Sequence, residues 1–306
     1  MQIKSKVQSL VAENKVKDAL DVFLSWAIEN NDGQLQNSLI MVQAKLARLK
    51  QQENLGIIQF SDSLREQAII TNSILEFLSQ IKETGSEKLG SFPESNDSRK
   101  VILFLASNPS ETSKLQLEKE FSRIFNGIQE GTKDLKLVAE WAVTPGGLQQ
   151  AILKHRPNIL HFSGHGTADE KGNGSDRDIF FEKGKRGGII LQDSNGKPKL
   201  VNTTALADLF ETMLTFKGIK IEVVILNACH QENQAKEIAK HVPYVIGTND
   251  AIDDNAAIEF STGFYRGISA KDSEVNSAFR LARNSIMLEG LEDSKVPVMY
   301  VNGERA

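Results

Sequence analysis

The sequence predicts an α/β fold with a mostly parallel sheet, preceded by a small all-α helical bundle. Apolar residues repeat at helical spacing over roughly the first 82 residues, and a stretch rich in Ser, Gly and Pro follows. After it, short apolar runs alternate with helical patterns, as is typical of parallel βαβ units. We therefore divide the chain into a helical domain (1–83), a linker (84–98) and an α/β domain (99–306).

The helical domain consists of amphipathic stripes. One stripe comprises Val16, Ala19, Leu20, Phe23, Leu24, Ala27 and Ile28, and a second comprises Leu35, Leu39, Val42, Leu46 and Leu49. A capping box, Ser63 with Glu66 three residues later, predicts the start of another helix. With a short first helix, this makes a bundle of three to four helices. The bundle contains no cysteine or histidine, so we do not expect it to carry chemistry.

Apolar runs in the α/β domain are the strand candidates. They are VILFLA (101–106), LKLVAEW (135–141), NILHFS (158–163), GIILQ (188–192), EVVILNA (222–228), YVIGT (244–248) and PVMYV (297–301). Continuous apolar runs fit strands that helices cover on both faces. The glycine-rich insert at 171–188 interrupts the alternation and is interpreted as a mobile loop or hairpin.

Composition limits the possible classes of function. Charged residues are 25% of the chain and the formal net charge is -4, so no basic field favours nucleic acid. No apolar run approaches the ~18 residues that span a bilayer, and the amino terminus lacks the apolar core of a signal peptide. We expect a soluble, cytoplasmic protein with no direct nucleic-acid or membrane partner.

Cys229 is the single cysteine, which excludes an internal disulfide and a cysteine zinc cluster. Taken alone, such a residue is most often a small buried hydrophobe. However, Cys229 directly follows one strand candidate, and His165 follows another within FSGHG. Sites in open parallel sheets gather beyond the carboxyl ends of the strands. Cys229 and His165 at the tips of neighbouring strands would have the geometry of a cysteine nucleophile and its base.

The neighbouring residues suit this chemistry. Gly166 has no side chain, so its N–H can approach a substrate carbonyl, and the N–H of Cys229 lies at a predicted strand-to-helix turn that favours negative charge. Together these amides could form an oxyanion hole. A metal pair of His161 and His165 is disfavoured, because four residues of strand span about 13 Å. No nucleotide-binding glycine pattern occurs in the right setting, so we expect neither a metal nor a cofactor.

Two blocks, ILHFSGHG and VILNAC, resemble the His-Gly and Ala-Cys blocks of caspase-like cysteine peptidases. Three further blocks resemble the CHAT branch of these peptidases, which includes relatives of separase: ILFLASNPSETSKLQLEKEF, GIILQDSNGKPKLVNTTALADLF and DDNAAIEFSTGFYRGI. The resemblance covers about 100–301. It implies a caspase-like αβα sandwich and a cysteine endopeptidase with His165 as base and Cys229 as nucleophile. The chain departs from the pattern after "IG", where CHAT domains often carry a tryptophan and this sequence has Thr248 and Asn249.

The same segment carries Asp250, Asp253 and Asp254. In relatives it borders the pocket for the side chain before the scissile bond, and arginine-cleaving members place an acid there. The resemblance therefore implies a preference for Arg or Lys, which a carboxylate would bind by charge and hydrogen bonds. Alternatively, Asp253 and Asp254 cap the following helix, because acids suit a helix start.

The amino-terminal segments VKDALDVFLSWAIEN and LGIIQFSDSLREQAIITNSILEFL resemble the effector-associated domains of bacterial conflict systems. Such domains are death-domain-like adaptors, which implies a sensor or effector partner carrying a matching helical domain. We thus expect a peptidase that acts on protein substrates, recruited and activated in a bacterial conflict or antiviral defence pathway. The insert at 171–188 suggests that the enzyme is latent when alone. The alternatives are a catalytically silent scaffold that binds peptide, and a bundle that serves only solubility or self-association.

Overall fold

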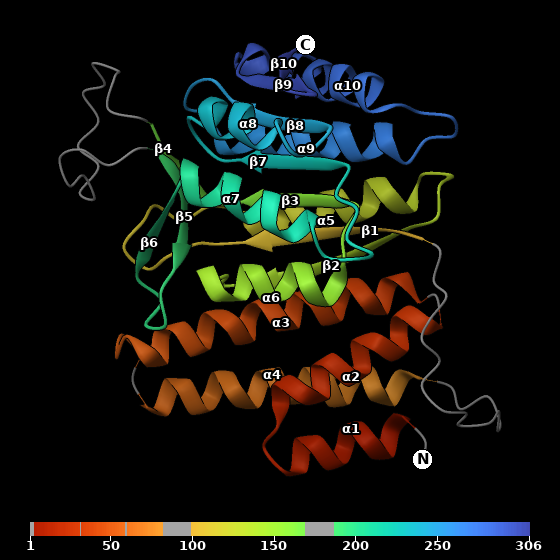
Figure 1. Cartoon of the computed structure of the whole chain (residues 1–306). Helices are drawn as coiled ribbons and strands as arrows, with labels where there is room; N and C mark the ends of the chain where they lie inside the picture. The colour runs from red at the N-terminus through yellow and green to blue at the C-terminus, as the bar shows by residue number, and fades with distance from the viewer. Residues whose placement is uncertain (1–2, 31, 59, 82–98, 169–186) are drawn as a thin grey trace. The chain divides into compact units, whose positions relative to one another are not determined.

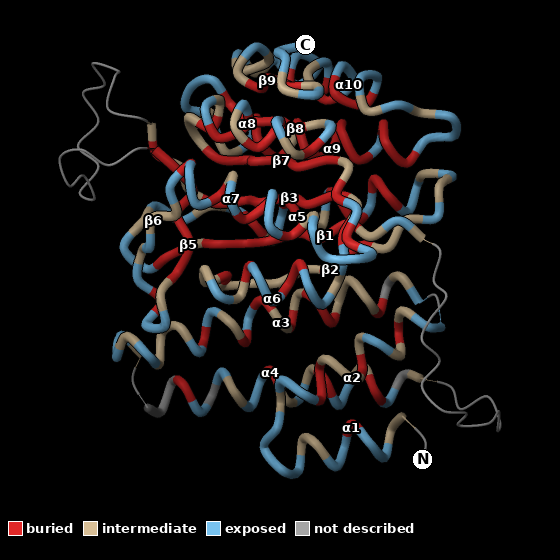
Figure 2. Tube along the Cα trace, in the orientation of Figure 1, coloured by how far each residue is buried: buried red, intermediate tan, exposed pale blue. Residues whose placement is uncertain are grey.

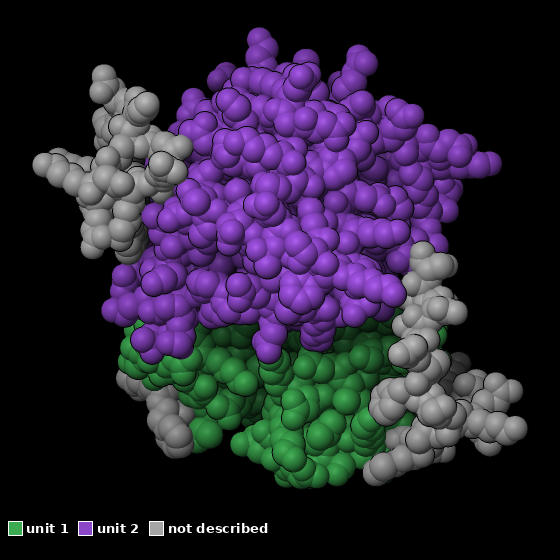
Figure 3. Space-filling view, viewed as in Figure 1, with its two compact units in different colours: residues 1–98 green, residues 99–306 purple. Residues whose placement is uncertain are grey.

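The computed structural model describes residues 3–30, 32–58, 60–81, 99–168 and 187–306. The chain divides into two compact units, Met1–Ser98 and Arg99–Ala306, which Figure 3 colours separately. The predicted linker and most of the insert at 171–188 lie outside the described residues. The latency that we attached to this insert therefore stays a prediction.

Unit 1 is helical over its described residues, which confirms the predicted bundle (Figure 1). Its helices are α1 (Ile3–Ala12), α2 (Val16–Glu29), α3 (Gly33–Asn54) and α4 (Phe60–Gln80). Their apolar stripes meet in one core, to which Leu20, Phe23, Leu39, Ile70 and Ile74 contribute. Asp32 caps α3 by accepting a hydrogen bond from the Leu35 N–H at 3.0 Å.

Ser63 does not cap the last helix of the bundle, so the capping-box prediction was wrong. α4 begins at Phe60, which places Ser63 inside the helix. Its hydroxyl donates to the carboxylate of Glu53 on α3, and Gln67 donates to the same carboxylate at 2.6 Å. Ser63 therefore contributes to the packing of α3 against α4, a long-range contact that the local pattern does not reveal.

The large sheet of unit 2 has seven strands among the described residues, in the order β10-β9-β8-β7-β3-β1-β2. These are β1 (Lys100–Ala106), β2 (Leu135–Trp141), β3 (Ile159–Ser163), β7 (Val223–Asn227), β8 (Tyr244–Thr248), β9 (Pro297–Val301) and β10 (Glu304–Arg305). From β2 to β8 neighbouring strands run parallel, whereas β9 and β10 pair antiparallel. The predicted mostly parallel sheet is confirmed.

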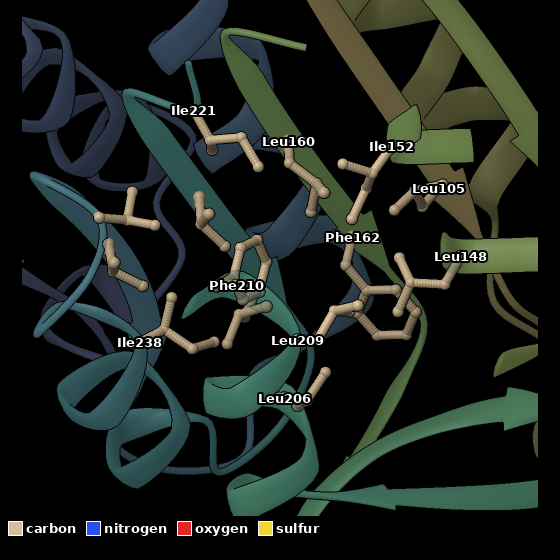
Figure 4. Close-up of a cluster of buried hydrophobic side chains, with 14 of the residues drawn as sticks. Leu105, Leu148, Ile152, Leu160, Phe162, Leu206, Leu209, Phe210, Ile221 and Ile238 are labelled. Carbon is tan, nitrogen blue, oxygen red and sulfur yellow. The ribbon is translucent and has the colours of Figure 1, made fainter. Parts of the chain in front are cut away.

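Helices cover both faces of this sheet (Figure 1), and buried residues run along its inner strands (Figure 2). They are α5 (Leu117–Gln129), α6 (Pro145–His155), α7 (Thr203–Leu214), α8 (Glu232–Ile238), α9 (Asp254–Ile268) and α10 (Val275–Leu288), followed by the short 3-10 helix η1 (Asp293–Lys295). On one face, Leu105, Leu160 and Phe162 pack with residues of α6, α7 and α8 (Figure 4). On the other face, Phe104 contacts Phe121 of α5, since successive strand residues alternate between faces. This layering confirms the expected caspase-like α/β sandwich.

The predicted strand GIILQ belongs to a different sheet from the other candidates. It forms β5 (Gly188–Gln192), which lies between β4 (His165–Thr167) and β6 (Pro198–Asn202) in an antiparallel sheet. All five residues of β5 are buried, which explains why the run has the apolar pattern of a parallel core strand. Among the described helices, none combines the length and apolar character needed to cross a membrane.

Candidate functional site

The segments that carry His165 and Cys229 lie side by side at the ends of adjacent strands. β3 pairs parallel with β7, and Ser163 is the register partner of Asn227. Just beyond this pair, the Gly164 N–H donates to the Asn227 carbonyl at 3.3 Å. His165 and Cys229 each follow two residues after the Ser163–Asn227 pair. The strand pairing thus brings together the two segments that the sequence singled out.

Gly166 packs directly against the Cys229 backbone. A Cβ at position 166 would lie 2.3 Å from the Cys229 carbonyl oxygen and 2.1 Å from Gln231 Nε2. Both distances are far below van der Waals contact, so a residue with a side chain does not fit here without moving its neighbours. Besides its predicted oxyanion role, Gly166 is therefore required for the close approach of the two segments.

A backbone carbonyl orients the imidazole of His165. His165 Nε2 lies 2.8 Å from the carbonyl oxygen of Ser113, in the segment between β1 and α5. A carbonyl can only accept, so Nε2 carries the proton and Nδ1 is the basic nitrogen of the neutral ring. Sequence reasoning missed Ser113, because a main-chain acceptor leaves no mark on residue identity.

Cys229 lies half-buried in the turn between β7 and α8. Its Sγ is 4.0 Å from the carbonyl oxygen of Ile252, so the segment after β8 runs beside the thiol. The next residue, His230, has a φ of 57° and its N–H donates to the Asp250 carbonyl at 3.1 Å. A left-handed conformation at a non-glycine residue is strained and persists where surrounding contacts enforce it.

Two polar side chains, those of Thr248 and Gln231, hold this turn by hydrogen bonds to its backbone. The Thr248 hydroxyl donates to the Ala228 carbonyl and accepts from the Gln231 N–H at 3.2 Å, so it bonds the backbone on both sides of Cys229. The buried Gln231 amide donates to the Cys229 carbonyl at 2.8 Å and to the Gly188 carbonyl of β5 at 3.2 Å. Neither residue was identified as a site residue from sequence.

The three acids after β8 have different surroundings. Asp253 is the N-cap of α9 and accepts from the Asn255 N–H at 2.9 Å. Asp254 accepts from the backbone and side chain of Gln116, at 3.2 and 2.9 Å. The Asp250 side chain is 74% exposed and lies 3.8 Å from His230 Nδ1. The capping alternative thus describes Asp253, and a role in substrate binding stays a prediction for all three.

His161 lies in the protein interior, with a hydrogen-bonding partner at each ring nitrogen. Its Nε2 lies 3.0 Å from Glu120 Oε1 and its Nδ1 lies 3.2 Å from the Tyr265 hydroxyl, with the side chain fully buried. Across the described ranges, no group of three or more His, Cys, Asp or Glu residues is arranged to hold a metal ion.

Comparison with known families finds two matching regions in the chain. Residues 2–82 match the family described as Effector-associated domain 11. Residues 70–295, well over half of the chain, match the family described as CHAT domain. The chain belongs to the CHAT-domain family. Both resemblances recognised in the sequence are thereby confirmed.

Two curated relatives carry protease names. This CHAT-domain chain is 24% identical over 301 residues to a "Roc-COR-CHAT protease" from an unknown prokaryotic organism, covering 93% of the chain and 26% of that protein. It is 23% identical over 170 residues to a "Probable protease" from Gillisia limnaea (strain DSM 15749 / LMG 21470 / R-8282), covering 54% of the chain and 26% of that protein. The chain thus spans 26% of the length of each.

Proposed function

We propose that this chain is a cysteine endopeptidase in which Cys229 is the nucleophile and His165 the general base. The observation that carries this proposal is the contact of Gly166 with the Cys229 backbone, which sets the His-Gly and Ala-Cys segments side by side. Membership of the CHAT-domain family and the protease names of two relatives support it.

The orientation of His165 suggests how the reaction proceeds. With Nε2–H held by the Ser113 carbonyl, Nδ1 accepts the thiol proton, and the Cys229 thiolate attacks the scissile carbonyl. His165 then donates this proton to the departing amine as the C–N bond breaks, leaving a thioester. A water molecule, deprotonated by His165, attacks the thioester, releases the carboxylate product and restores the thiol. The Ser113 carbonyl stabilises the imidazolium that forms in between.

The negative oxygen of each tetrahedral intermediate needs hydrogen-bond donors. We assign this role to the backbone amides of Gly166 and Cys229, which belong to the two segments in contact. Donors held by a rigid backbone stabilise developing charge without reorganising during the reaction. The hydrogen bonds of Thr248 and Gln231 around Cys229 would provide this rigidity.

A comparison of wild type with Cys229→Ala and His165→Ala tests the proposal. Each full-length protein is incubated with a proteome-derived peptide library, and the new amino termini are identified by mass spectrometry. We expect each variant to lose activity by ~1,000-fold or more, because the dyad acts as a unit. Equal cleavage by wild type and Cys229→Ala would remove Cys229 from the mechanism. A wild type that cuts nothing and has an ordinary Cys229 thiol would favour the silent scaffold.

We further propose that unit 1 recruits the peptidase to a sensor or effector protein with a matching helical domain, in a bacterial conflict or antiviral defence pathway. The match of residues 2–82 to an effector-associated domain supports this role. Full-length Cys229→Ala protein, which preserves bound substrates, serves as bait for proteins encoded beside its gene. Recovery of a partner with a similar helical domain is the expected result. Self-association alone, measured by light scattering, would favour the simpler role in oligomerisation.

A further inference from the structure

A carboxyl group is buried beneath the candidate site. Glu120 lies on α5 within the buried stripe of Leu117, Phe121 and Ile124, and 2% of its surface is exposed. Transfer of a carboxylate into a protein interior is strongly unfavourable unless hydrogen bonds compensate for the lost water. A charged residue at such a position needs partners, and these partners indicate what it does.

Glu120 accepts hydrogen bonds from two strands and one helix. Its Oε1 accepts from His161 Nε2 at 3.0 Å, from Asn227 Nδ2 at 2.6 Å and from Ser261 Oγ at 2.6 Å, and its Oε2 accepts from Ser163 Oγ. Burial raises the pKa of Glu120, but the hydrogen bond and charge of His161 and the two serine hydroxyls outweigh it. The pKa therefore lies below its ordinary value, and Glu120 is a carboxylate at neutral pH.

The far side of His161 is fixed as well. The Tyr265 hydroxyl of α9 lies 3.2 Å from His161 Nδ1, and the imidazole stacks on Phe104 with ring centroids 5.3 Å apart. Burial, followed by the charge of Glu120, raises the pKa of Tyr265, so the phenol keeps its proton. The Glu120 carboxylate can only accept, so His161 Nε2 carries a proton that points at Glu120, while Nδ1 faces the Tyr265 hydroxyl. The imidazole thus has one orientation.

Two of the donors to Glu120 are the last residues of the strands that lead to the proposed dyad. Ser163 ends β3, Asn227 ends β7, and the two are register partners. The carboxylate therefore ties both strand ends together where the chain leaves the sheet toward His165 and Cys229. We infer that Glu120, oriented by His161, is a positioning residue that fixes the separation of His165 and Cys229. This inference rests on the proposed dyad, because the buried Glu120 could affect catalysis only through His165 and Cys229.

The reactivity of Cys229 toward iodoacetamide measures this role directly, because the chain has one cysteine. The alkylation rate of full-length protein is recorded from pH 5 to 9, at a temperature where circular dichroism shows every variant to be folded. We expect Glu120→Gln to slow alkylation at pH 7 by ~10-fold and to move the midpoint toward the ~8.5 of a free thiol. A purely structural role would lower the melting temperature and leave the profile of the folded protein unchanged.

Other titratable groups must be kept constant in this comparison. In the described part of the chain, Glu120 faces His161 and Tyr265, and the surroundings of Cys229 include His165, His230 and Asp250. All are retained in Glu120→Gln. Glu140→Gln is the matched control, because Glu140 lies on β2, which β1 separates from β3, and it pairs with His155 of α6 at 2.8 Å. Its alkylation profile should equal that of wild type.

Ser261→Ala provides a milder test if Glu120→Gln does not fold. It removes one donor to the carboxylate and should slow alkylation at pH 7 by ~3-fold, in keeping with the loss of one hydrogen bond. A wild-type profile in folded Glu120→Gln, or in Ser261→Ala where the former does not fold, would overturn the positioning role. His165→Ala separates the two proposals. If the alkylation profile changes in His165→Ala but not in Glu120→Gln or Ser261→Ala, the dyad is supported and the positioning role is overturned. An unchanged profile in His165→Ala contradicts both the dyad and the positioning role.

Discussion

The α-carbon of Gly166 approaches the Cys229 carbonyl so closely that a Cβ would stand 2.3 Å from its oxygen. This contact couples the residue after the proposed base to the proposed nucleophile through backbone alone. Neither side can yield easily, because Gln231 and Thr248 hold the Cys229 turn by hydrogen bonds. The effect of a methyl group at position 166 is therefore a sensitive measure of the site geometry.

We expect Gly166→Ala to displace Cys229 and to lower both peptide cleavage and Cys229 alkylation at pH 7. Misplacement of a reacting group by about 1 Å can reduce a rate ~100-fold. Gly146→Ala is the matched control, since Gly146 lies in α6 and has no atom within 4 Å of the added Cβ. Wild-type rates in a folded Gly166→Ala protein would contradict the idea that this contact sets the geometry.

Thr248→Val should destabilise the Cys229 turn, because it keeps the shape of the side chain and removes the hydroxyl. The Ala228 carbonyl and the Gln231 N–H would each lose a buried partner. Leaving such groups unsatisfied costs about 1–3 kcal/mol, which urea denaturation can detect. Thr248→Ser retains the hydroxyl and should recover most of the loss. Equal stability of the Val and Ser variants would assign the role of Thr248 to packing.

Glu140 should make the stability of unit 2 depend on pH. Partial burial raises its pKa, but the hydrogen bond with His155 and the charge of Lys154 outweigh burial and hold the pKa at about 2, below the ordinary 4.5. A lowered folded-state pKa contributes stability that is present above the ordinary value and is lost as the pH falls through the folded value. The urea midpoint of wild type should therefore exceed that of Glu140→Gln at pH 7, and the difference should shrink between pH 4.5 and pH 2. Glu237→Gln, at an exposed pair with Lys240, serves as the control and should show little difference at either pH.

Asp250→Asn should weaken cleavage after arginine if Asp250 binds the side chain before the cut. Loss of a charge-assisted hydrogen bond predicts a fall in kcat/KM of ~10-fold for arginine peptides, with less effect on others. Asp253→Asn is a suitable control, because asparagine also caps helices well and preserves the start of α9. Cuts after Leu, Asp or small residues that Asp250→Asn leaves unchanged would remove the acid from the specificity pocket.

Much of the fold follows from local pattern. Each apolar run named as a strand is a strand, because runs such as VILFLA have too few polar atoms to lie anywhere but in a covered sheet. The partner of a strand depends on contacts distant in sequence, which is why GIILQ was expected with the parallel strands and forms β5 of the antiparallel sheet. Strands β4, β6 and β10 were not predicted. The three residues of β4 and the two of β10 are too few to show a period, and none of the five residues of β6 is buried.

The residues that support the site were harder to find than the residues proposed to react. Cys229 and His165 stand out by type and by their place after a strand. Glu120 is one of many glutamates, although its position within the apolar stripe of α5 was a visible signal. The Ser113 carbonyl gives no sequence signal, because every residue type has a main-chain carbonyl and only the backbone geometry places this one beside His165. Groups such as Glu120 and the Ser113 carbonyl are recognised by their position in the folded structure and not by residue type.

The strand that leads to Cys229 lies in the middle of the sheet, since β7 has β8, β9 and β10 on one side and β3, β1 and β2 on the other among the strands described. Local opening of a sheet begins at its edges, where fewer hydrogen bonds and less packing resist it. Amide hydrogens of Val224 and Leu226 should thus be among the last in unit 2 to exchange with solvent. Cys229 thus directly follows the strand that is expected to open last, so fluctuations at the edge strands can occur while the geometry around Cys229 is retained.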